Sequence, residues 1–502
     1  MRAIGGRWRQ NIILWLGQRA LFLAGMGVFL SVMLNTLPTR LSQDGWLSLV
    51  SGRYITQHGL PHSDTLTVFA HGASWVDQQW LSQLASYEAQ QLGGLPLYSI
   101  MYIFLTVGAL GMAIAGAHRL GAADAHIIWV LPIVVFFYSA GSFNIRTQGF
   151  AYPLFVGVLW LLAASIRDPR RKVVYWVFPL LILWANLHGS AVIGAGLAVF
   201  YGLSLVCQEI PGLSHRWRIN PRIFVFVIGG PLCLLCTPYG LSMLTYYHET
   251  LTNPLFKQLI IEWHPILSFG LIIAAPFFLT AFVVVWLFGY GNAKVALSQN
   301  LRSGIFTILV LVTLIAATVS VARNLIWFSL ALVVLFPPYL STIFKPRPTL
   351  PHRRLDLALL GASAVFLLLS LMVVLSQPSA WFQGGYSPHL LNQVKVAVQQ
   401  RPDVRVYAEG RFSDWLLWEE PSLAGRIAYD SRLELLTSEQ LRAIVRLEAD
   451  GVSAPGTPST LDGYGLLMLD TSNLDYRYIL KQPGVHVLSR EPGVVIATRS
   501  GK

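Results

Sequence analysis

The sequence predicts a polytopic α-helical membrane protein that ends in a small α/β domain. Three observations indicate this class. Of the 502 residues, 54% are hydrophobic and 12% are charged, and the mean hydropathy is +0.55, as is typical of membrane proteins. Apolar runs of nearly membrane-spanning length alternate with short loops as far as Ser376. From Gln377 onward the sequence instead has short strand-like runs and amphipathic helical patterns.

Eleven membrane spans are expected, and the basic residues between them orient the chain. The loops assigned to the cytoplasm, with the N-terminal segment, hold eighteen Lys and Arg, against five in the loops assigned to the outside. By the positive-inside rule the N-terminus lies inside and the C-terminus outside. The basic residues form no single patch, so we expect no nucleic-acid partner. The spans are expected near residues 20–38, 96–117, 126–140, 148–166, 173–187, 189–207, 223–239, 265–290, 304–321, 325–343 and 356–376.

Residues 39–95 are expected to form the first external loop, the longest polar segment within the apolar region. Ser42 is a plausible N-cap of a short helix that Gly59 and Pro61 end. Asp44 then lies in the first helical turn, where the helix dipole favours a carboxylate. Asp44 is either a helix-capping acid or a catalytic acid, since membrane-adjacent carboxylates are commonly functional.

A second helix is expected to begin near Trp80, with an apolar stripe opposite a polar one. The pattern is typical of an interfacial helix that lies on the bilayer. The apolar stripe consists of Trp80, Leu81, Leu84, Ala85 and Tyr87, and the polar stripe of Gln79, Ser82, Gln83, Glu88 and Gln90.

Residues 377–502 are expected to fold as an extracytoplasmic α/β domain, and residues 1–376 as the transmembrane domain. The expected strands are VRVYAE, AGRIAYD, YGLLMLD, GVHVLSR and GVVIATR, and the last two form a hairpin. The expected helices are SDWLLWEE, TSEQLRAIVRLEA and NLDYRYILKQ.

With this topology, nearly every unusual ionisable residue of the apolar region lies at an external membrane boundary. The group consists of Asp44, Asp64, Arg146, His188, Glu262 and Arg323, with Gln79, Trp80 and Tyr239 nearby. We expect no metal centre among them; a divalent cation held by Asp44, Asp64 and Glu262 is conceivable but has no support in the pattern.

The first external loop resembles that of type-C fold (GT-C) membrane glycosyltransferases. The motifs are an acid after the first span, then W-L-x-L-x-x-G-R, G-L-P-x-x-D and W-x-x-x-x-W-L-S. This superclass uses polyprenyl-phosphate-linked sugars and includes protein O-mannosyltransferases and oligosaccharyltransferases. The resemblance implies that Asp44 is the catalytic base or its equivalent. Relatives often have His-Glu where this chain has Gln78-Gln79, which puts an acidic role at that point in doubt.

Further motifs along the chain resemble the same superclass. They are RTQGFAYPLF, WANLHGS, TPYGL and IIEWHP, and Ser413-Asp414-Trp415 lies where oligosaccharyltransferases have an acceptor-binding W-D-x-G motif. Metal-dependent relatives have a D-x-D-like pair in the second external loop. The corresponding segment here, SAGSFNIRTQGF, has no acid, so metal dependence is not expected.

The resemblance implies a glycosyltransferase of the integral (inner or plasma) membrane, with its site facing the periplasm or cell exterior. It would move a hexose or pentose from a polyprenyl-phosphate donor to a glycan, lipid-linked or protein acceptor. Attack from the face opposite the phosphate would invert the anomeric centre. A lipid or solute transporter and a non-catalytic scaffold for envelope glycan assembly are the alternative functions.

In this interpretation Asp44 is the first candidate for the base and Asp64 the second. Arg146, His188 and Arg323 would bind the donor phosphate, since guanidinium and imidazole groups donate well to it. The other candidates, Gln79, Trp80, Tyr239 and Glu262, would position the acceptor or the loops.

Structural roles compete with these functional ones. The structural alternative for Arg146 is snorkelling to headgroups. For His188 it is joining two helix ends through backbone hydrogen bonds, and for Arg323 it is stabilising a turn. Glu262 has Lys257 and Arg323 as possible partners, and Asp64 is a candidate turn residue.

Overall fold

The computed structural model describes residues 2–168, 172–206, 220–294, 301–345, 353–450, 460–473 and 476–500. The expected Gly/Pro/Ser loop at 451–459 lies outside the described residues. The same holds for five basic residues assigned to cytoplasmic loops: Arg170, Arg171, Arg216, Arg218 and Arg347.

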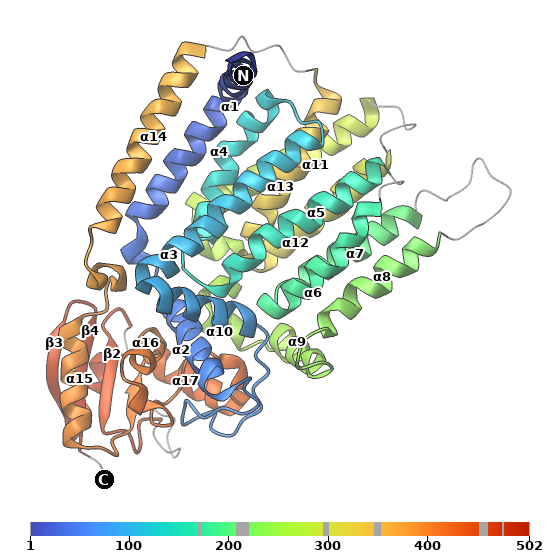
Figure 1. Cartoon of the computed structure of the whole chain (residues 1–502). Helices are drawn as coiled ribbons and strands as arrows, with labels where there is room; N and C mark the ends of the chain where they lie inside the picture. The colour runs from blue at the N-terminus through green and yellow to red at the C-terminus, as the bar shows by residue number, and fades with distance from the viewer. Residues whose placement is uncertain are drawn as a thin grey trace.

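A helix occupies each of the eleven expected spans (Figure 1). Among the described residues, six helices are long and apolar enough to cross a membrane, and five more apolar helices are shorter. The helices are α1 (Arg2–Asn35), α3 (Trp80–Arg119), α4 (Asp124–Gly141), α5 (Ala151–Arg167), α6 (Val177–Leu187), α7 (Ala191–Val206), α8 (Pro221–Leu232), α11 (Leu271–Lys294), α12 (Leu301–Ser320), α13 (Leu325–Ile343) and α14 (Arg353–Leu375).

Several of these helices differ from the expected bounds, and α8 and α11 show a local cause. The helix α8 ends at Leu232, and the chain turns through the short 3₁₀ helix η4 (Cys233–Leu235), so the span is shorter than the expected 223–239. Pro231 contributes, because proline removes a backbone donor near the helix end. The helix α11 begins at Leu271 because Gly270 has a φ of 76°, which ends the preceding η6 (Ile266–Phe269).

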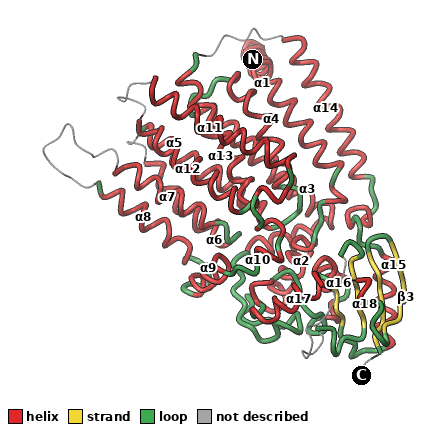
Figure 2. Tube along the Cα trace, turned by 180° about the vertical axis from the view of Figure 1, so that it is seen from behind, coloured by secondary structure: helices red, strands yellow, loops and turns green. Residues whose placement is uncertain are grey.

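The helices differ strongly in burial. The helix α13 lies inside the bundle, with 83% of its most apolar window buried, whereas 17% of that of α14 is buried. The helix α14 packs along α1 at one edge of the bundle (Figures 1 and 2). Gly27 of α1 allows close approach, since a Cβ there would lie 2.3 Å from Ser363 Oγ. Ser363 donates a hydrogen bond to the Ala24 carbonyl oxygen (2.8 Å), the kind of polar contact that joins membrane helices.

The 39–95 loop consists of α2 (Gln43–His58), an irregular segment and the first turns of α3. The second expected helix is not separate: it continues into α3 through a kink at Gly93 and Gly94. Its polar side faces protein, because Ser82 and Gln83 are buried and Ser82 Oγ donates to the Leu187 carbonyl oxygen (2.7 Å). Ser82 and Gln83, on the polar stripe of the expected interfacial helix, are therefore covered by protein.

The C-terminal segment (residues 377–502) contains a four-stranded sheet in the order β1-β2-β4-β3. The pair β1–β2 is parallel, whereas β2–β4 and the expected β3–β4 hairpin are antiparallel. The elements are α15 (Pro388–Gln400), β1 (Val406–Ala408), α16 (Gly410–Glu419), α17 (Ser438–Asp450), β2 (Leu466–Asp470), α18 (Tyr476–Ile479), β3 (Val485–Glu491) and β4 (Val494–Arg499).

The expected strand at AGRIAYD forms only isolated bridges, and it joins the C-terminal segment to the 39–95 loop. Ile427 pairs with Val406 of β1 on one side and with Thr67 of the loop on the other. Val68 N donates to the Ile427 carbonyl oxygen (2.8 Å), and Gly425 N donates to the Leu66 carbonyl oxygen (2.8 Å). The two regions, far apart in sequence, therefore form one layer at the end of the bundle opposite the N-terminus (Figures 1 and 2).

The remaining short elements connect the helices. They are η1 (Leu37–Thr39), η2 (Thr147–Phe150), η3 (Lys172–Trp176), α9 (Ser242–Thr252), α10 (Phe256–Leu259), η5 (Ile261–Trp263), η7 (Ala322–Asn324), η8 (Ser379–Gln383), η9 (Pro421–Leu423) and η10 (Leu433–Leu435).

Candidate active site

Three of the candidate side chains meet in one ion-pair cluster. Arg146, from the loop between α4 and α5, lies between Asp44 of α2 and Glu262 of η5. Its Nε is 3.4 Å from Asp44 Oδ2, and its Nη1 donates a 2.5 Å hydrogen bond to Glu262 Oε2. The Arg146 side chain is 10% exposed, whereas those of Asp44 and Glu262 are 37% and 33% exposed. Arg146 therefore turns into the protein and does not snorkel.

Arg146 and Glu262 keep their charges. Burial disfavours the charged guanidinium, but Glu262 and Asp44 outweigh burial and raise the pKa of Arg146. Burial would raise the pKa of Glu262, but the positive charges of Arg146 and Arg323 lower it. Glu262 is thus an ionised partner of Arg146 near neutral pH. The structural alternative names Lys257 or Arg323 as its partner.

The backbone holds Arg146 and Asp44 in register. Leu41 and Ile145 form a parallel bridge, and Ile145 N donates to the Arg40 carbonyl oxygen (2.8 Å). Asp44 follows Leu41 by three residues, and Arg146 follows Ile145 directly. The α2 helix begins without a side-chain cap from Ser42, and among the described contacts Asp44 pairs with Arg146.

A second cation, Arg323 of η7, lies beside this cluster. Its Nε donates to Gln148 Oε1 (3.3 Å), and no ion pair within 4 Å joins it to a described acid. Its charge acts on both Glu262 and His188. Asn324, and not Arg323, holds the local turn, through hydrogen bonds to the Ala317 and Val321 carbonyl oxygens.

His188 follows α6 and is buried. Its Nδ1 accepts a hydrogen bond from Ser190 N (3.0 Å), so it joins the ends of α6 and α7 as the structural alternative proposed. An accepting Nδ1 places the ring proton on Nε2, which is then a donor. Burial, with the charges of Arg323 and Arg146, lowers the pKa of His188 well below its usual range, so the ring is neutral.

The start of α3 connects the loops that carry Arg146 and His188. Thr147 Oγ1 donates to Gln79 Oε1 (2.5 Å), and Gly189 N donates to Gln78 Oε1 (2.9 Å). Trp80 Nε1 donates to Asn186 Oδ1 (2.9 Å). Both glutamines thus act here as hydrogen-bond acceptors.

Tyr239 is buried between the loop after α8 and the 39–95 loop. Its hydroxyl donates to the Pro61 carbonyl oxygen (2.9 Å), and its ring packs edge-on against His62. The geometry is that of a residue that holds the loop.

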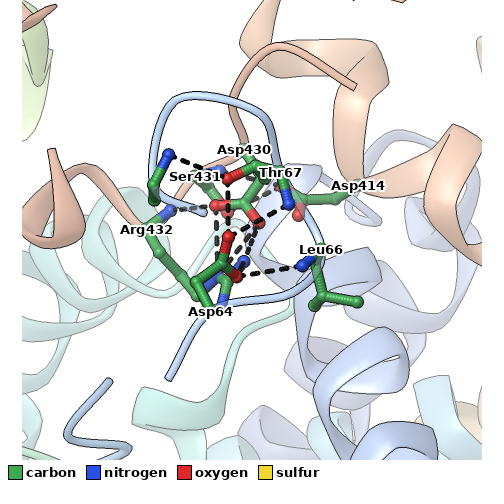
Figure 3. A network of polar contacts seen from close by, with 8 residues as sticks. Asp64, Leu66, Thr67, Asp414, Asp430, Ser431 and Arg432 are labelled. Carbon is green, nitrogen blue, oxygen red and sulfur yellow. Dashed lines mark hydrogen bonds and ion pairs between the residues drawn. The ribbon is translucent and has the colours of Figure 1, made fainter. Parts of the chain in front are cut away.

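Asp64 lies in a different network, whose acids and arginine are buried (Figure 3). Its Oδ1 accepts from Arg432 Nη2 (2.6 Å) and Leu66 N (3.2 Å), and its Oδ2 accepts from Thr67 N (3.0 Å) and Oγ1 (2.8 Å). Burial would raise its pKa, but Arg432 and these hydrogen bonds lower it. With no exposed surface and both oxygens engaged, Asp64 forms the turn that was the alternative to its role as a base.

Arg432 is the centre of this network, and the sequence did not identify it. It bonds Asp430 through Nε (2.9 Å) and Nη2 (2.5 Å), and its guanidinium carbon lies 4.1 Å from the centre of the Trp75 ring. Nearby Asp414 accepts from Ser431 Oγ (2.7 Å). Burial, with the charge of Asp430, raises the pKa of Asp414 well above its usual range.

Two further acids near this layer escaped sequence reasoning as site candidates. Burial raises the pKa of Asp77 to about 7 and that of Glu434 to about 7. The sequence marks Asp430, Arg432 and Glu434 only by their closeness in the segment IAYDSRLELL. This segment has no helical or strand periodicity that would predict that these side chains are buried.

Among the described residues, no group of three His, Cys, Asp or Glu side chains is arranged to hold a metal ion. The cation at the centre of the acidic candidates is Arg146 itself.

Comparisons with known proteins identify the fold. No protein-family model matches the chain, and no curated protein sequence matches it. Solved structures do match along nearly the whole chain. One is ArnT from Cupriavidus metallidurans bound to undecaprenyl phosphate, at 13% identity and a TM-score of 0.50, covering 96% of this chain and 98% of that one.

A second similar structure is the archaeal oligosaccharyltransferase AglB from Archaeoglobus fulgidus in complex with an inhibitory peptide and a dolichol-phosphate. It is 11% identical, with a TM-score of 0.52 and coverage of 97% of this chain and 75% of that one. The Archaeoglobus fulgidus oligosaccharyltransferase tethered to an acceptor peptide matches at 11% identity and a TM-score of 0.52, over 97% of this chain and 74% of that one. At these identities the likeness establishes a shared fold.

Proposed function

We propose, from the GT-C fold that the chain shares with these glycosyltransferases, that it transfers a sugar from a polyprenyl-phosphate donor. The acceptor would be a glycan, a lipid-linked saccharide or a protein, at the membrane face that carries the C-terminal segment. The observation that carries the proposal is the ion-pair cluster of Asp44, Arg146 and Glu262 beside Arg323. The relatives bound undecaprenyl phosphate and dolichol-phosphate respectively, which supports a lipid phosphate as the leaving group.

Asp44 is the proposed base. Only Oδ2 of its carboxylate faces Arg146, and more than a third of the side chain is exposed, which leaves room for an acceptor hydroxyl. The proton of that hydroxyl would pass to Asp44 as its oxygen bonds to the anomeric carbon. We no longer assign this role to Asp64, because its oxygens already accept four hydrogen bonds inside the protein.

Arg323 and His188 are the proposed phosphate ligands. Arg323 has no ion-pair partner within 4 Å among the described acids, so its charge is available to a phosphate. Neutral His188 can offer its Nε2 proton. Arg146 is engaged by two carboxylates, so we assign it to holding the base in place, although its charge also acts on the phosphate. Attack opposite the departing phosphate would invert the anomeric centre without a covalent intermediate.

The test uses the full-length protein in nanodiscs with a panel of undecaprenyl-phosphate-linked sugars, and measures release of undecaprenyl phosphate. Asp44→Asn is expected to lower turnover about 100-fold or more, as removal of a general base does, with unchanged binding of undecaprenyl phosphate. Asp124→Asn is the matched control, because Asp124 forms a similar pair with His118 (2.6 Å) outside the site and should leave turnover unchanged. Wild-type turnover in Asp44→Asn would refute the assignment.

The alternative functions give different results in the same experiment. A transporter would move the lipid across the nanodisc or vesicle bilayer without cleaving it, and a scaffold would show neither activity. Full turnover by the wild type on any member of the panel would exclude both.

A further inference from the structure

We propose that Arg146 takes the place of a divalent cation in this site, so that the protein needs no metal ion. The part of this inference that concerns transfer rests on the proposed function, and the part that concerns metal binding does not. The carrying observation is geometric: carboxylates from two separate loops, Asp44 and Glu262, converge on one guanidinium at 3.4 Å and 2.5 Å.

Several of the ligand atoms that a metal ion would use are already engaged. Asp44 and Glu262 each turn one oxygen to Arg146. The nearby amide oxygens of Gln78 and Gln79 accept from Gly189 N and Thr147 Oγ1. The Nδ1 of His188 accepts from Ser190 N. Ca²⁺ takes six to eight oxygen ligands and Mg²⁺ needs near-ideal octahedral geometry, with water completing the shell, and the described residues offer no group of three acidic, His or Cys ligands here.

The charges around the cluster also disfavour a divalent cation. Arg146 and Arg323 already place two positive charges beside the carboxyl groups of Glu262 and Asp44. A guanidinium cannot lose its proton in a protein, so this countercharge is permanent. A divalent ion added between the same carboxylates would face repulsion from both arginines.

The loop that carries Arg146 is built to hold it there. Gly149 lies against the ring of Tyr102, where a Cβ would come within 2.5 Å of a ring carbon. Arg40 lies on the other side, since its Nη1 donates to the Phe143 carbonyl oxygen (2.9 Å) and its carbonyl oxygen accepts from Ile145 N (2.8 Å). A guanidinium held in this way is a preorganised charge, which is what an electrostatic role in catalysis requires.

The first experiment measures Mn²⁺ binding by electron paramagnetic resonance on the purified, EDTA-treated wild type. No saturable binding is expected up to millimolar Mn²⁺. Stoichiometric Mn²⁺ that disappears in the Glu262→Gln variant would overturn the inference. This measurement needs no substrate, so it stands or falls independently of the proposed function.

The second experiment measures transfer. Wild-type turnover is expected to be insensitive to EDTA. Arg146→Gln is expected to lower it about 100-fold, the loss typical of removing one preorganised stabilising group, and Arg146→Lys, which keeps the charge, is expected to retain more activity than Arg146→Gln. Arg119→Gln, which removes an arginine stacked on Trp160 at the far end of α3, is the control with unchanged turnover.

The outcomes separate the two proposals. Turnover that EDTA abolishes and Mn²⁺ restores would refute metal independence and leave the transferase function intact. Equal activities of the Gln and Lys variants would refute the countercharge role of Arg146. Absence of Mn²⁺ binding with no turnover on any lipid-linked sugar would refute the proposed function alone.

Discussion

Replacing Arg432 by Met tests whether the buried ion pairs hold the C-terminal segment onto the 39–95 loop. The Arg432 side chain is 2% exposed, and it bonds Asp64, which is fully buried, and Asp430. Removing one partner of a buried ion pair leaves an uncompensated charge and costs about 3–5 kcal/mol. With a urea m-value of about 1–3 kcal/mol/M, the unfolding midpoint should fall by more than about 1 M. Tryptophan fluorescence reports it, because Trp75 lies against Arg432.

Two further variants make this test decisive. Adding Asp64→Asn and Asp430→Asn to Arg432→Met removes the stranded charges and should recover most of the lost free energy of unfolding. Arg499→Gln breaks the more exposed pair with Asp462 and should cost less than about 1 kcal/mol. A midpoint shift for Arg432→Met no larger than that for Arg499→Gln would show that the network does not join the two regions.

Two other predictions concern pH and helix packing. Burial raises the folded-state pKa of Asp77 to about 7 from an ordinary value of 3.8. The contribution of Asp77 to stability is therefore present below about pH 4 and is lost as pH rises through 7. Asp77→Asn should raise the melting temperature at pH 8 more than at pH 5, and an equal shift at both pH values would contradict this. Gly27→Ala should force Ser363 from its hydrogen bond and cost about 1 kcal/mol; in the Ser363→Ala background the added methyl group should cost less, as thermal unfolding in detergent would show.

Helix positions were predictable because lipid imposes one requirement on every span. A backbone in hydrocarbon must satisfy its own hydrogen bonds, so an apolar run of sufficient length becomes a helix. The ends were less predictable, as α8 and α11 show, because Pro231 and Gly270 act on them locally. The strand expected at AGRIAYD failed as a regular strand since its partner, Thr67, belongs to a loop far away in sequence.

Some features of the candidate site were also predictable from the sequence, and others were not. Asp44, Arg146 and Glu262 were identifiable one by one, because ionisable residues at the ends of apolar runs are unusual. Asp64 had the same local signal, but its partner is Arg432, which is 368 residues away. No periodicity marks Arg432 as buried, so sequence reasoning could not separate a structural acid from a reactive one.

The pairing of residues 66–69 with residues 425–428 has a consequence for biogenesis. The backbone groups of Val68 and Phe69 have their partners, the carbonyl oxygens of Ile427 and Ala428, at the other end of the chain. At a synthesis rate of about 5–20 residues per second, the ribosome needs roughly 20 to 70 s to reach those partners. The backbone of the 39–95 loop therefore stays incompletely hydrogen-bonded until α14, the last apolar helix, has been inserted. A nascent chain stopped before residue 425 would contain Asp44, Arg146 and Glu262. It would still lack residues 425–428, whose backbone holds the 39–95 loop in place.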